Sequence, residues 1–160
     1  INETIEQLEP RASKNKINLI NKNLNDSGKI LVVADYYRIY QVLKNLATNA
    51  IKYSDPHTSV TVYIKKRKKV ATIHVEDQGK GIAKNHRKRV FERFYRIEKS
   101  RSKERGGTGL GLAISKHIIE GHKTKIKLKS KVNFGSTFSF NLKLLPKKIK
   151  KRQKIAQTLN

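Results

Sequence analysis

Residues 105–112 read Arg-Gly-Gly-Thr-Gly-Leu-Gly-Leu, a glycine-rich loop that leads directly into a predicted helix. From Leu110 onward, apolar residues recur at the spacing of one helix face, at Leu112, Ile114, Ile118 and Ile119. The loop glycines leave backbone amides open to a ligand, since no Cβ atom stands in the way: Gly106, Gly107, Gly109 and Gly111. A helix that begins in such a loop points unpaired N–H groups and the positive end of its dipole toward the loop. The stretch therefore predicts a binding site for a polyphosphate.

The length of the chain, 160 residues, favours one domain with a hydrophobic core of its own. No apolar run is long enough to span a membrane, and no signal peptide is recognisable. The absence of Cys excludes disulfides and thiolate metal sites. Because the chain begins without Met, we expect it to be part of a longer protein.

The chain is strongly basic, with 37 Lys and Arg against 12 Asp and Glu and a net charge of +25. Such a balance suggests a nucleic-acid or anionic-membrane surface, whereas its spread along the chain suggests biased composition. Two runs stand out, residues 65–69 and 147–154, which we interpret as a solvated hairpin turn and a frayed end. No aromatic residues interleave with them for base stacking, so nucleic-acid binding is not predicted. We expect one domain over residues 1–146 and a basic tail over 147–160.

The N-terminal part predicts a helix and two short strands. Residues 2–16 have helical periodicity, although Pro10 falls within them. Residues 17–24 and 30–33 follow the pattern of strands, with a turn at 25–28 between them.

A long helix follows, capped by Asp35 and stopped by Ser54-Asp55-Pro56. Its apolar stripe has a regular spacing of three and four: Ile39, Val42, Leu43, Leu46, Ala47 and Ala50. A second stripe, formed by Asn45, Asn49 and Lys52, places two amides and an ammonium at the edge of the buried face.

The C-terminal part predicts mostly strands. Residues 60–64 and 71–75 alternate as an antiparallel hairpin, and the strand signals at 126–128 and 138–144 flank a turn. A short helix is expected at 86–94, and a longer one begins near Gly109. This order predicts an α+β fold, a two-layer sandwich in which helices cover one face of a mixed, mostly antiparallel sheet.

Five blocks of sequence occur in an order that resembles one known family: Asn45-Leu-Ala-Thr-Asn49-Ala-Ile-Lys52-Tyr53-Ser, Asp77-Gln-Gly79-Lys-Gly81-Ile82, Val90-Phe91-Glu-Arg-Phe94-Tyr95-Arg96, Gly106-Gly107-Thr108-Gly109-Leu110-Gly111-Leu112 and Gly135-Ser-Thr137-Phe-Ser-Phe. They resemble the N box, first glycine box, F box, second glycine box and final glycine motif of two-component sensor histidine kinases. The resemblance covers residues 30–144. It implies the ATP-binding sandwich shared with gyrase, Hsp90 and MutL, and it is nearest to membrane-bound, phosphate-response-type kinases.

The resemblance implies an ATP site built from these blocks. Asp77 would accept the adenine amino group, Tyr53 would pack on the nucleotide, and Thr137 would touch the adenine site. From the residues alone, a turn-capping aspartate, a core tyrosine and an ordinary strand threonine remain open alternatives. The implied ATP-binding residues are Asn45, Asn49, Lys52, Tyr53, Asp77, Gly79, Gly81, Ile82, Phe91, Tyr95, Arg96, Gly107, Thr108, Gly109, Leu110, Gly111, Leu112 and Thr137.

The resemblance also implies catalytic roles for Asn45, Asn49, Lys52 and Arg96. Asn49 would be the Mg²⁺ ligand, with Asn45 in the same shell, and Lys52 and Arg96 would reach phosphate oxygens. Phosphoryl transfer depends on positioning and on neutralised charge, which this inventory supplies. ATP-hydrolysing relatives carry a Glu general base where this chain has Asn45, so transfer to another side chain is favoured over hydrolysis. An ATP hydrolase of this fold and a nucleotide-dependent regulatory module, such as an anti-sigma serine kinase, remain alternatives.

The phosphoryl acceptor is expected on another domain, because none of the five histidines has the sequence context of the family's phosphorylated histidine. The resemblance implies two partners, the dimerising helical domain of the same kinase and a response regulator. It also implies a cytoplasmic domain of a bacterial membrane-anchored sensor kinase. Residues 82–105 would form a lid that ATP orders, anchored by aromatic residues that could meet the helical domain. The family's His-Gly-Gly reads His122-Lys123-Thr124 here, so that turn must differ.

Overall fold

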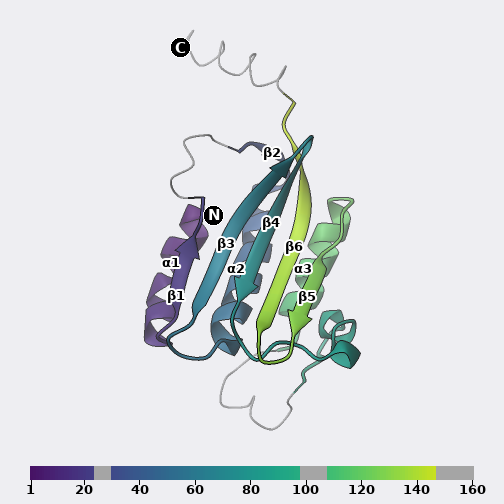
Figure 1. The fold of residues 1–160 in the computed structure, drawn as a ribbon. Coiled ribbons are helices and arrows are strands. Elements are labelled where there is room, and N and C mark those ends of the chain that lie inside the picture. Colours follow the sequence, from purple (N-terminus) through teal and green to yellow (C-terminus); the bar gives the residue numbers. More distant parts are fainter. Residues whose placement is uncertain (24–29, 98–107, 147–160) are drawn as a thin grey trace.

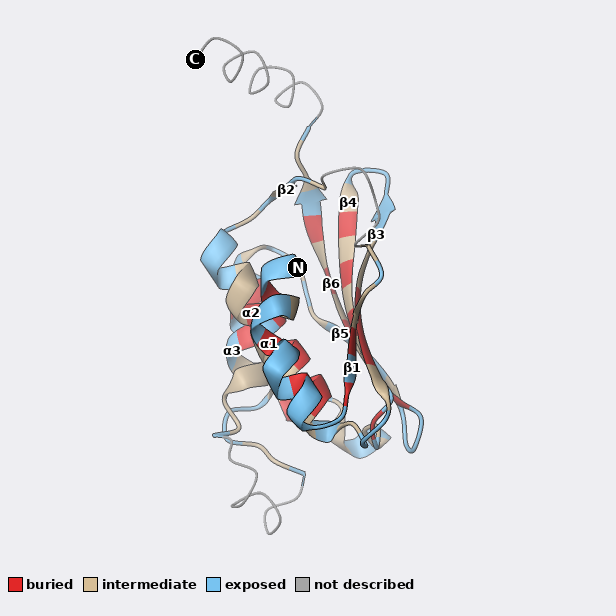
Figure 2. Ribbon diagram, turned by 90° about the vertical axis from the view of Figure 1, so that its left-hand side faces the viewer, coloured by how far each residue is buried: buried red, intermediate tan, exposed pale blue. Residues whose placement is uncertain are grey.

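The computed structural model describes residues 1–23, 30–97 and 108–146 as a two-layer sandwich. Three helices cover one face of a sheet and leave its other face open (Figures 1 and 2). The helices are α1 (Asn2–Lys14), α2 (Tyr36–Tyr53) and α3 (Gly111–Gly121). The predicted α+β sandwich is confirmed.

The sheet is mixed and mostly antiparallel, as predicted. Its strands follow the order β1 (Asn18–Asn21), β3 (Ser59–Arg67), β4 (Val70–Asp77), β6 (Gly135–Leu144) and β2 (Val32–Val33). β5 (Lys127–Lys131) pairs with the first half of β6, while β2 pairs with its last residues. β1 runs parallel to β3, and the other pairs are antiparallel.

The core lies between the sheet and the helices (Figure 2). Along β4, Ala71, Ile73 and Val75 are buried and alternate with half-exposed residues, as expected for a strand with one covered face. The predicted stripe of α2 packs against them, with Val42, Leu43, Leu46, Ala47 and Ala50 buried. Removing this apolar surface from water is the main force that joins the two layers.

The N-terminal elements are close to the prediction. Pro10 lies within α1, and the predicted strand 17–24 is shortened to Asn18–Asn21. The predicted turn at 25–28 lies outside the described residues.

The predicted helix at 86–94 is wrong. Two single turns of 3₁₀ helix stand there instead, η1 (Lys84–His86) and η2 (Arg89–Phe91). Between residues 83 and 92 only Val90 is buried, so an amphipathic helix would have no apolar face to bury.

In the turn after α3, His122-Lys123-Thr124, one non-glycine residue takes the left-handed conformation. Lys123 has a φ of 57°, and the Thr124 N–H donates to the Ile119 carbonyl at 3.3 Å. The left-handed position therefore holds Lys123 and not Thr124.

Candidate nucleotide site

Asp77 is a buried carboxylate at the end of β4, with 7% of its surface exposed. Its Oδ1 atom accepts two backbone hydrogen bonds, from Gly79 N at 3.0 Å and Ser136 N at 3.1 Å. Within the described residues no protein group donates to Oδ2. The carboxylate is thus held in one orientation, with its second oxygen available to accept a hydrogen bond from a ligand.

Burial dominates the electrostatics of Asp77. Desolvation raises the pKa of its carboxyl above the ordinary 3.8, against the opposite effect of the two backbone N–H donors. A carboxylate that folding desolvates in this way destabilises the protein, and a polar ligand that donates to it would offset the cost.

Two glycines let the backbone close around Asp77. A Cβ atom on Gly79 would lie 2.2 Å from the Tyr53 carbonyl oxygen at the end of α2. At Gly135, whose φ is +104°, it would lie 2.0 Å from the Asp77 carbonyl oxygen. Glycine is therefore required at both positions by the packing of one backbone segment on another.

Thr137 lies on the wrong face of the sheet for the predicted adenine contact. In the β4–β6 register Asp77 faces Ser136, whereas Thr137 faces Glu76 on the open side. Ser136 is buried, and its hydroxyl lies 2.9 Å from the Ser130 hydroxyl. Ser136 was not among the predicted site residues, although its position two residues before the buried Phe138 on the same strand predicts that it faces the same side.

The polar stripe of α2 runs from the Asp77 end of the sheet toward the start of α3. Asn45 Nδ2 donates to the Gly111 carbonyl at 3.3 Å and to the Ser115 hydroxyl at 3.4 Å, so this amide joins α2 to α3. Asn49 is half-buried, and its side-chain amide makes no hydrogen bond to the described residues. Lys52 Nζ lies 5.3 Å from the centroid of the Tyr53 ring, and Tyr53 as a whole is 53% exposed.

The start of α3 faces this stripe. Leu110 is its N-cap and makes no side-chain capping bond, so the first N–H groups of the helix remain available to an anion. Phe94 N donates a hydrogen bond to the Gly109 carbonyl at 3.1 Å. This bond connects the chain before residue 98 to the chain after residue 107. Arg96 Nη2 is buried and has no hydrogen-bond partner in the described structure. The start of α3 is thus rich in N–H donors, and the segment that carries Arg96 is held beside it through Phe94.

The remaining predicted residues differ in their surroundings. Ile82 packs on the core and donates its N–H to the Ser130 hydroxyl at 2.7 Å, and Phe91 packs edge-on against Phe138. Tyr95 is engaged elsewhere, with its hydroxyl 2.6 Å from His86 Nδ1 and Arg89 over its ring. The segment after Gly81 is thus held to the sheet through Ile82 and Phe91, and its own residues are held together through Tyr95.

Three further predicted residues lie beside the start of α3. Thr108 Oγ1 accepts a hydrogen bond from Leu110 N at 3.4 Å, and Leu112 packs against the core. Gly107 and the part of the predicted lid beyond residue 97 lie outside the described residues.

Residues 34–146 match the family described as histidine kinase-, DNA gyrase B- and HSP90-like ATPase. The chain belongs to this family. It is 44% identical over 115 residues to the sensor-like histidine kinase SenX3 of Mycolicibacterium smegmatis, covering 72% of the chain and 30% of that relative. It is 39% identical over 123 residues to the sensor histidine kinase WalK of Bacillus subtilis, covering 76% of the chain and 20% of WalK. The ATPase-like domain thus spans under a third of the length of these relatives.

Solved structures resemble the ATPase-like domain over nearly its whole length. The mycobacterial sensor histidine kinase MprB has a TM-score of 0.73 at 25% identity, covering 91% of this chain and 92% of that one. Full-length ShkA, in complex with AMPPNP, has a TM-score of 0.77 at 26% identity, covering 89% of this chain and 29% of that one. The fold and the family are therefore shown by independent comparisons.

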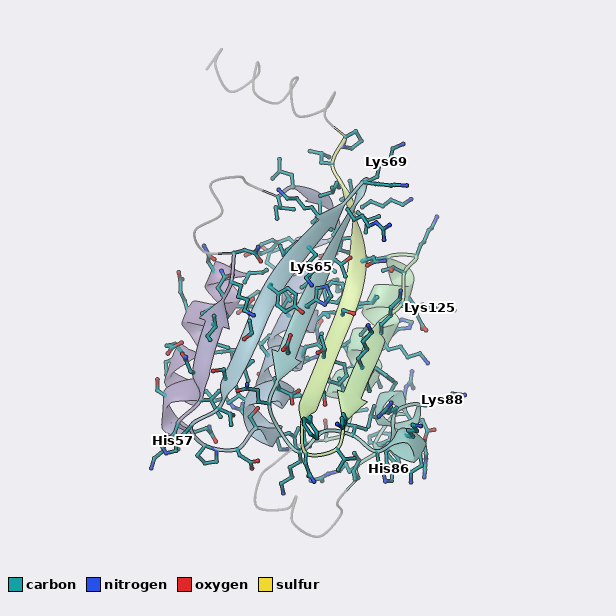
Figure 3. The ribbon with its side chains drawn as sticks, viewed as in Figure 1. His57, Lys65, Lys69, His86, Lys88 and Lys125 are labelled. Carbon is teal, nitrogen blue, oxygen red and sulfur yellow. The ribbon has the colours of Figure 1, made fainter. Side chains whose placement is uncertain are left out.

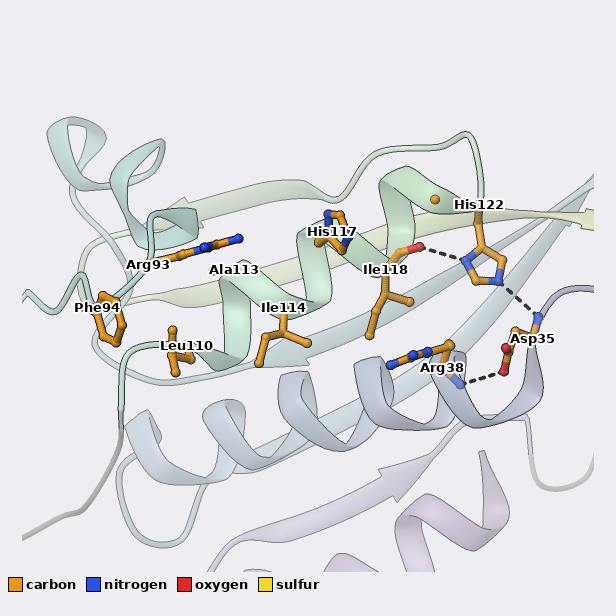
Figure 4. Close-up of a pocket in the computed structure, with 11 residues that line it drawn as sticks. Asp35, Arg38, Arg93, Phe94, Leu110, Ala113, Ile114, His117, Ile118 and His122 are labelled. Atoms are coloured by element: carbon orange, nitrogen blue, oxygen red, sulfur yellow. Dashed lines mark hydrogen bonds between the residues drawn. The ribbon is translucent and has the colours of Figure 1, made fainter.

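A separate groove of about 580 Å³ lies along the ATPase-like domain's α3, and Asp77 does not line it (Figure 4). Its apolar lining comes from Phe94, Leu110, Ala113, Ile114 and Ile118, with Arg38, Arg93 and His117 among its polar residues. At one end His122 joins two helices, since its Nε2 accepts from Asp35 N at 3.1 Å and its Nδ1 lies 2.8 Å from the Ile118 carbonyl. The groove and the Asp77 site are thus two distinct features that meet near the start of α3.

The donor set of the Asp77 site fits a nucleotide with Mg²⁺ better than a metal ion alone. The described residues contain no cluster of three or more His, Cys, Asp or Glu able to hold a metal. Asn49 offers one amide oxygen, and Mg²⁺ in proteins commonly takes one or two protein oxygens together with phosphate oxygens and water. No helix in the described part of the ATPase-like domain is long and apolar enough to cross a membrane.

Proposed function

We propose that this domain binds ATP with Mg²⁺ and transfers the γ-phosphoryl group to a histidine on a separate dimerising helical domain, for relay to an aspartate of a response regulator. The observation that carries the proposal is the fixed, buried carboxylate of Asp77 with one unused oxygen. A carboxylate acceptor there is matched by the exocyclic amino group of adenine. The AMPPNP complex of the similar kinase ShkA supports a nucleotide as ligand.

A nucleotide placed along α2 would have its base at Asp77 and its phosphates at the start of α3. From Tyr53 back to Asn45 the helix rises by about 12 Å, a span that suits the ribose and the phosphates. At the far end, the open N–H groups of α3 and the unpartnered Arg96 Nη2 provide donors for phosphate oxygens. Lys52, on the same side of the helix, would add a cation.

Mg²⁺, when bound, neutralises phosphate charge during transfer. Asn49 is the residue placed to hold it, because its amide is half-buried beside the phosphate end and makes no hydrogen bond to the described residues. Asn45 would orient the site by holding α3 against α2 through Gly111 and Ser115. Its amide cannot act as a general base toward water, which favours transfer over hydrolysis.

The groove along α3 is suited to the helical partner domain. Its apolar residues include Phe94, which is 70% exposed, and Ile114, which is 38% exposed, so part of this surface remains uncovered. It adjoins the phosphate end of the site, as an acceptor histidine would require. We further propose that the whole protein is a membrane-anchored sensor kinase, by analogy with SenX3 and WalK.

A single-turnover assay with labelled ATP and Mg²⁺ tests the proposed function, with and without an added histidine-bearing helical domain. Label on the added domain, and only when this chain is present, is the expected result. Asp77→Asn should weaken nucleotide binding by about tenfold to a hundredfold, because a hydrogen bond to a charged acceptor is lost. Asp55→Asn, at an exposed acid, is the matched control and should bind normally. Phosphate release to water without transfer would favour the hydrolase alternative.

A further inference from the structure

The end of the sheet opposite Asp77 unites basic segments that are far apart in the sequence. Arg67 and Val70 close the β3–β4 hairpin through the turn Lys68-Lys69, and Leu144 at the end of β6 donates its N–H to the Lys69 carbonyl at 2.9 Å. Figure 3 shows Lys69 at this end, whereas Lys88 and His86 lie at the other. The eight residues of β4 put roughly 25 Å between the two ends.

The register forms one row of alternating basic and apolar side chains across this end. Arg67 faces Val70, Val70 faces Lys143, and Lys143 faces Val33 of β2. Residues directly opposite one another point to the same side, so all four lie on the open face of the sheet. Exposed lysines surround the row: Lys65, Lys66, Lys68 and Lys69.

Apolar side chains are exposed within this basic surface. Val33 is 55% exposed and Leu31 is 40% exposed, although both belong to the segment that pairs with the last residues of β6. The strand segments 59–72, 137–146 and 30–34 contain no acidic residue. None of their cations is in an ion pair within the described residues, where Arg89–Glu92 and Lys116–Glu120 are the pairs present. Within the described residues, therefore, no ion pair offsets the positive charge of this end.

We propose that this surface, formed by Leu31, Val33, residues 65–70 and Lys143, docks on an anionic phospholipid bilayer. Flexible lysines beside shallow aliphatic residues recognise charge density and an apolar interface, whereas protein hot spots use buried aromatic and Arg anchors in pockets. The sequence continues from Pro146 at this end with further cations at 147, 148, 150, 151, 152 and 154. The proposal rests on the proposed function only in placing the domain near a membrane. Docking by this end would leave the Asp77 site facing away from the lipid.

A tryptophan reporter tests the contact, because the chain contains no Trp of its own. The fluorescence of Val33→Trp should shift to the blue with vesicles of phosphatidylglycerol and phosphatidylcholine, and not with phosphatidylcholine alone. Phe134→Trp, at an exposed position in the turn at the opposite end, is the matched reporter and should not shift. Equal shifts for both reporters would mean adsorption through net charge alone and would overturn the proposal.

Charge reversal gives a second, independent test by vesicle co-sedimentation of the whole chain. Lys66→Glu/Arg67→Glu/Lys69→Glu should weaken binding by about tenfold or more, since each cation contributes separately to attraction by an anionic surface. Arg11→Glu/Lys14→Glu/Lys125→Glu changes the net charge equally at other exposed positions, outside the proposed nucleotide site and lid, and should weaken it much less. Equal losses, or tighter capture by duplex DNA than by vesicles, would overturn the proposal. Both variants should retain nucleotide affinity, so failure here is distinguishable from failure of the nucleotide proposal.

Discussion

The two ends of β4 differ in what fixes their backbone. At the Asp77 end, the tight approach of Gly135 to the Asp77 carbonyl leaves no room for a Cβ atom. At the hairpin end, Lys68 also has a positive φ, of 52°. A positive φ is thus accepted by a lysine where the turn is open to solvent, at a backbone cost, and requires glycine where another backbone segment lies against it. Steric contact between backbone segments therefore decides the residue type at the Asp77 end, whereas the hairpin end accepts a charged residue.

The largest expected effect is at Gly135. A Cβ atom 2.0 Å from the Asp77 carbonyl oxygen must displace β4 or β6, and the φ of +104° adds backbone strain. We expect Gly135→Ala to lower the free energy of unfolding by about 3 kcal/mol or more and to abolish nucleotide binding. Urea unfolding and nucleotide titration measure the two effects. A variant as stable as the parent would show that the turn can relax and that the two ends do not differ.

Asp77→Asn should separate stability from recognition. Burial raises the folded-state pKa of Asp77, so the folded protein binds a proton more readily than the unfolded chain does. The contribution of Asp77 to stability is therefore most favourable below the unfolded pKa and is lost as the pH rises through the folded pKa. At neutral pH, Asp77→Asn should unfold at higher urea concentration than the parent despite binding nucleotide more weakly. That stability difference should shrink as the pH falls toward 3.8, and a less stable variant at neutral pH would contradict the assignment.

Local patterns predicted the elements of the site better than their relative orientation. The apolar stripe of α2 and the strand that ends at Asp77 were both expected, because each depends on periodicity within a single element. The Thr137 prediction was wrong because the side of the sheet to which a β6 residue points, relative to Asp77, depends on the pairing register of β4 and β6. The paired residues are some sixty positions apart in the sequence, and a short motif does not contain that register.

The position of the basic hairpin turn in the fold also depends on long-range pairing that the local sequence does not contain. The hairpin turn was predicted as solvated, and nothing in the sequence placed it beside Val33 and Lys143. That arrangement follows from β2 joining the far edge of β6, a pairing between two residues on each strand. The 3₁₀ turns at 84–91 were missed because their hydrogen bonds and the single buried Val90 leave no repeating signal in the sequence.

A smaller effect is expected at the hairpin turn. Lys68→Gly removes the cost of a left-handed lysine and should raise the free energy of unfolding by about 0.5 to 1 kcal/mol. Lys69→Gly removes the same charge at a neighbouring residue without a positive φ, and it should bring no such gain. If the two variants gain equally, relief of charge repulsion and not backbone strain sets the stability of this end.

The smallest effect is expected at Gly121, the last residue of α3, and it is the counterpart of Gly135. A Cβ atom there meets nothing within 4 Å, and its φ is not in the left-handed region, so Gly121→Ala should gain about 0.5 kcal/mol from reduced freedom of the unfolded chain. Replacing glycine by alanine would then raise the free energy of unfolding at Gly121 and lower it at Gly135. Urea unfolding of the two variants side by side measures both changes. Because propensity and chain entropy change alike in the two variants, a loss at Gly121 as well as at Gly135 would mean that close backbone approach is not what distinguishes the Asp77 end.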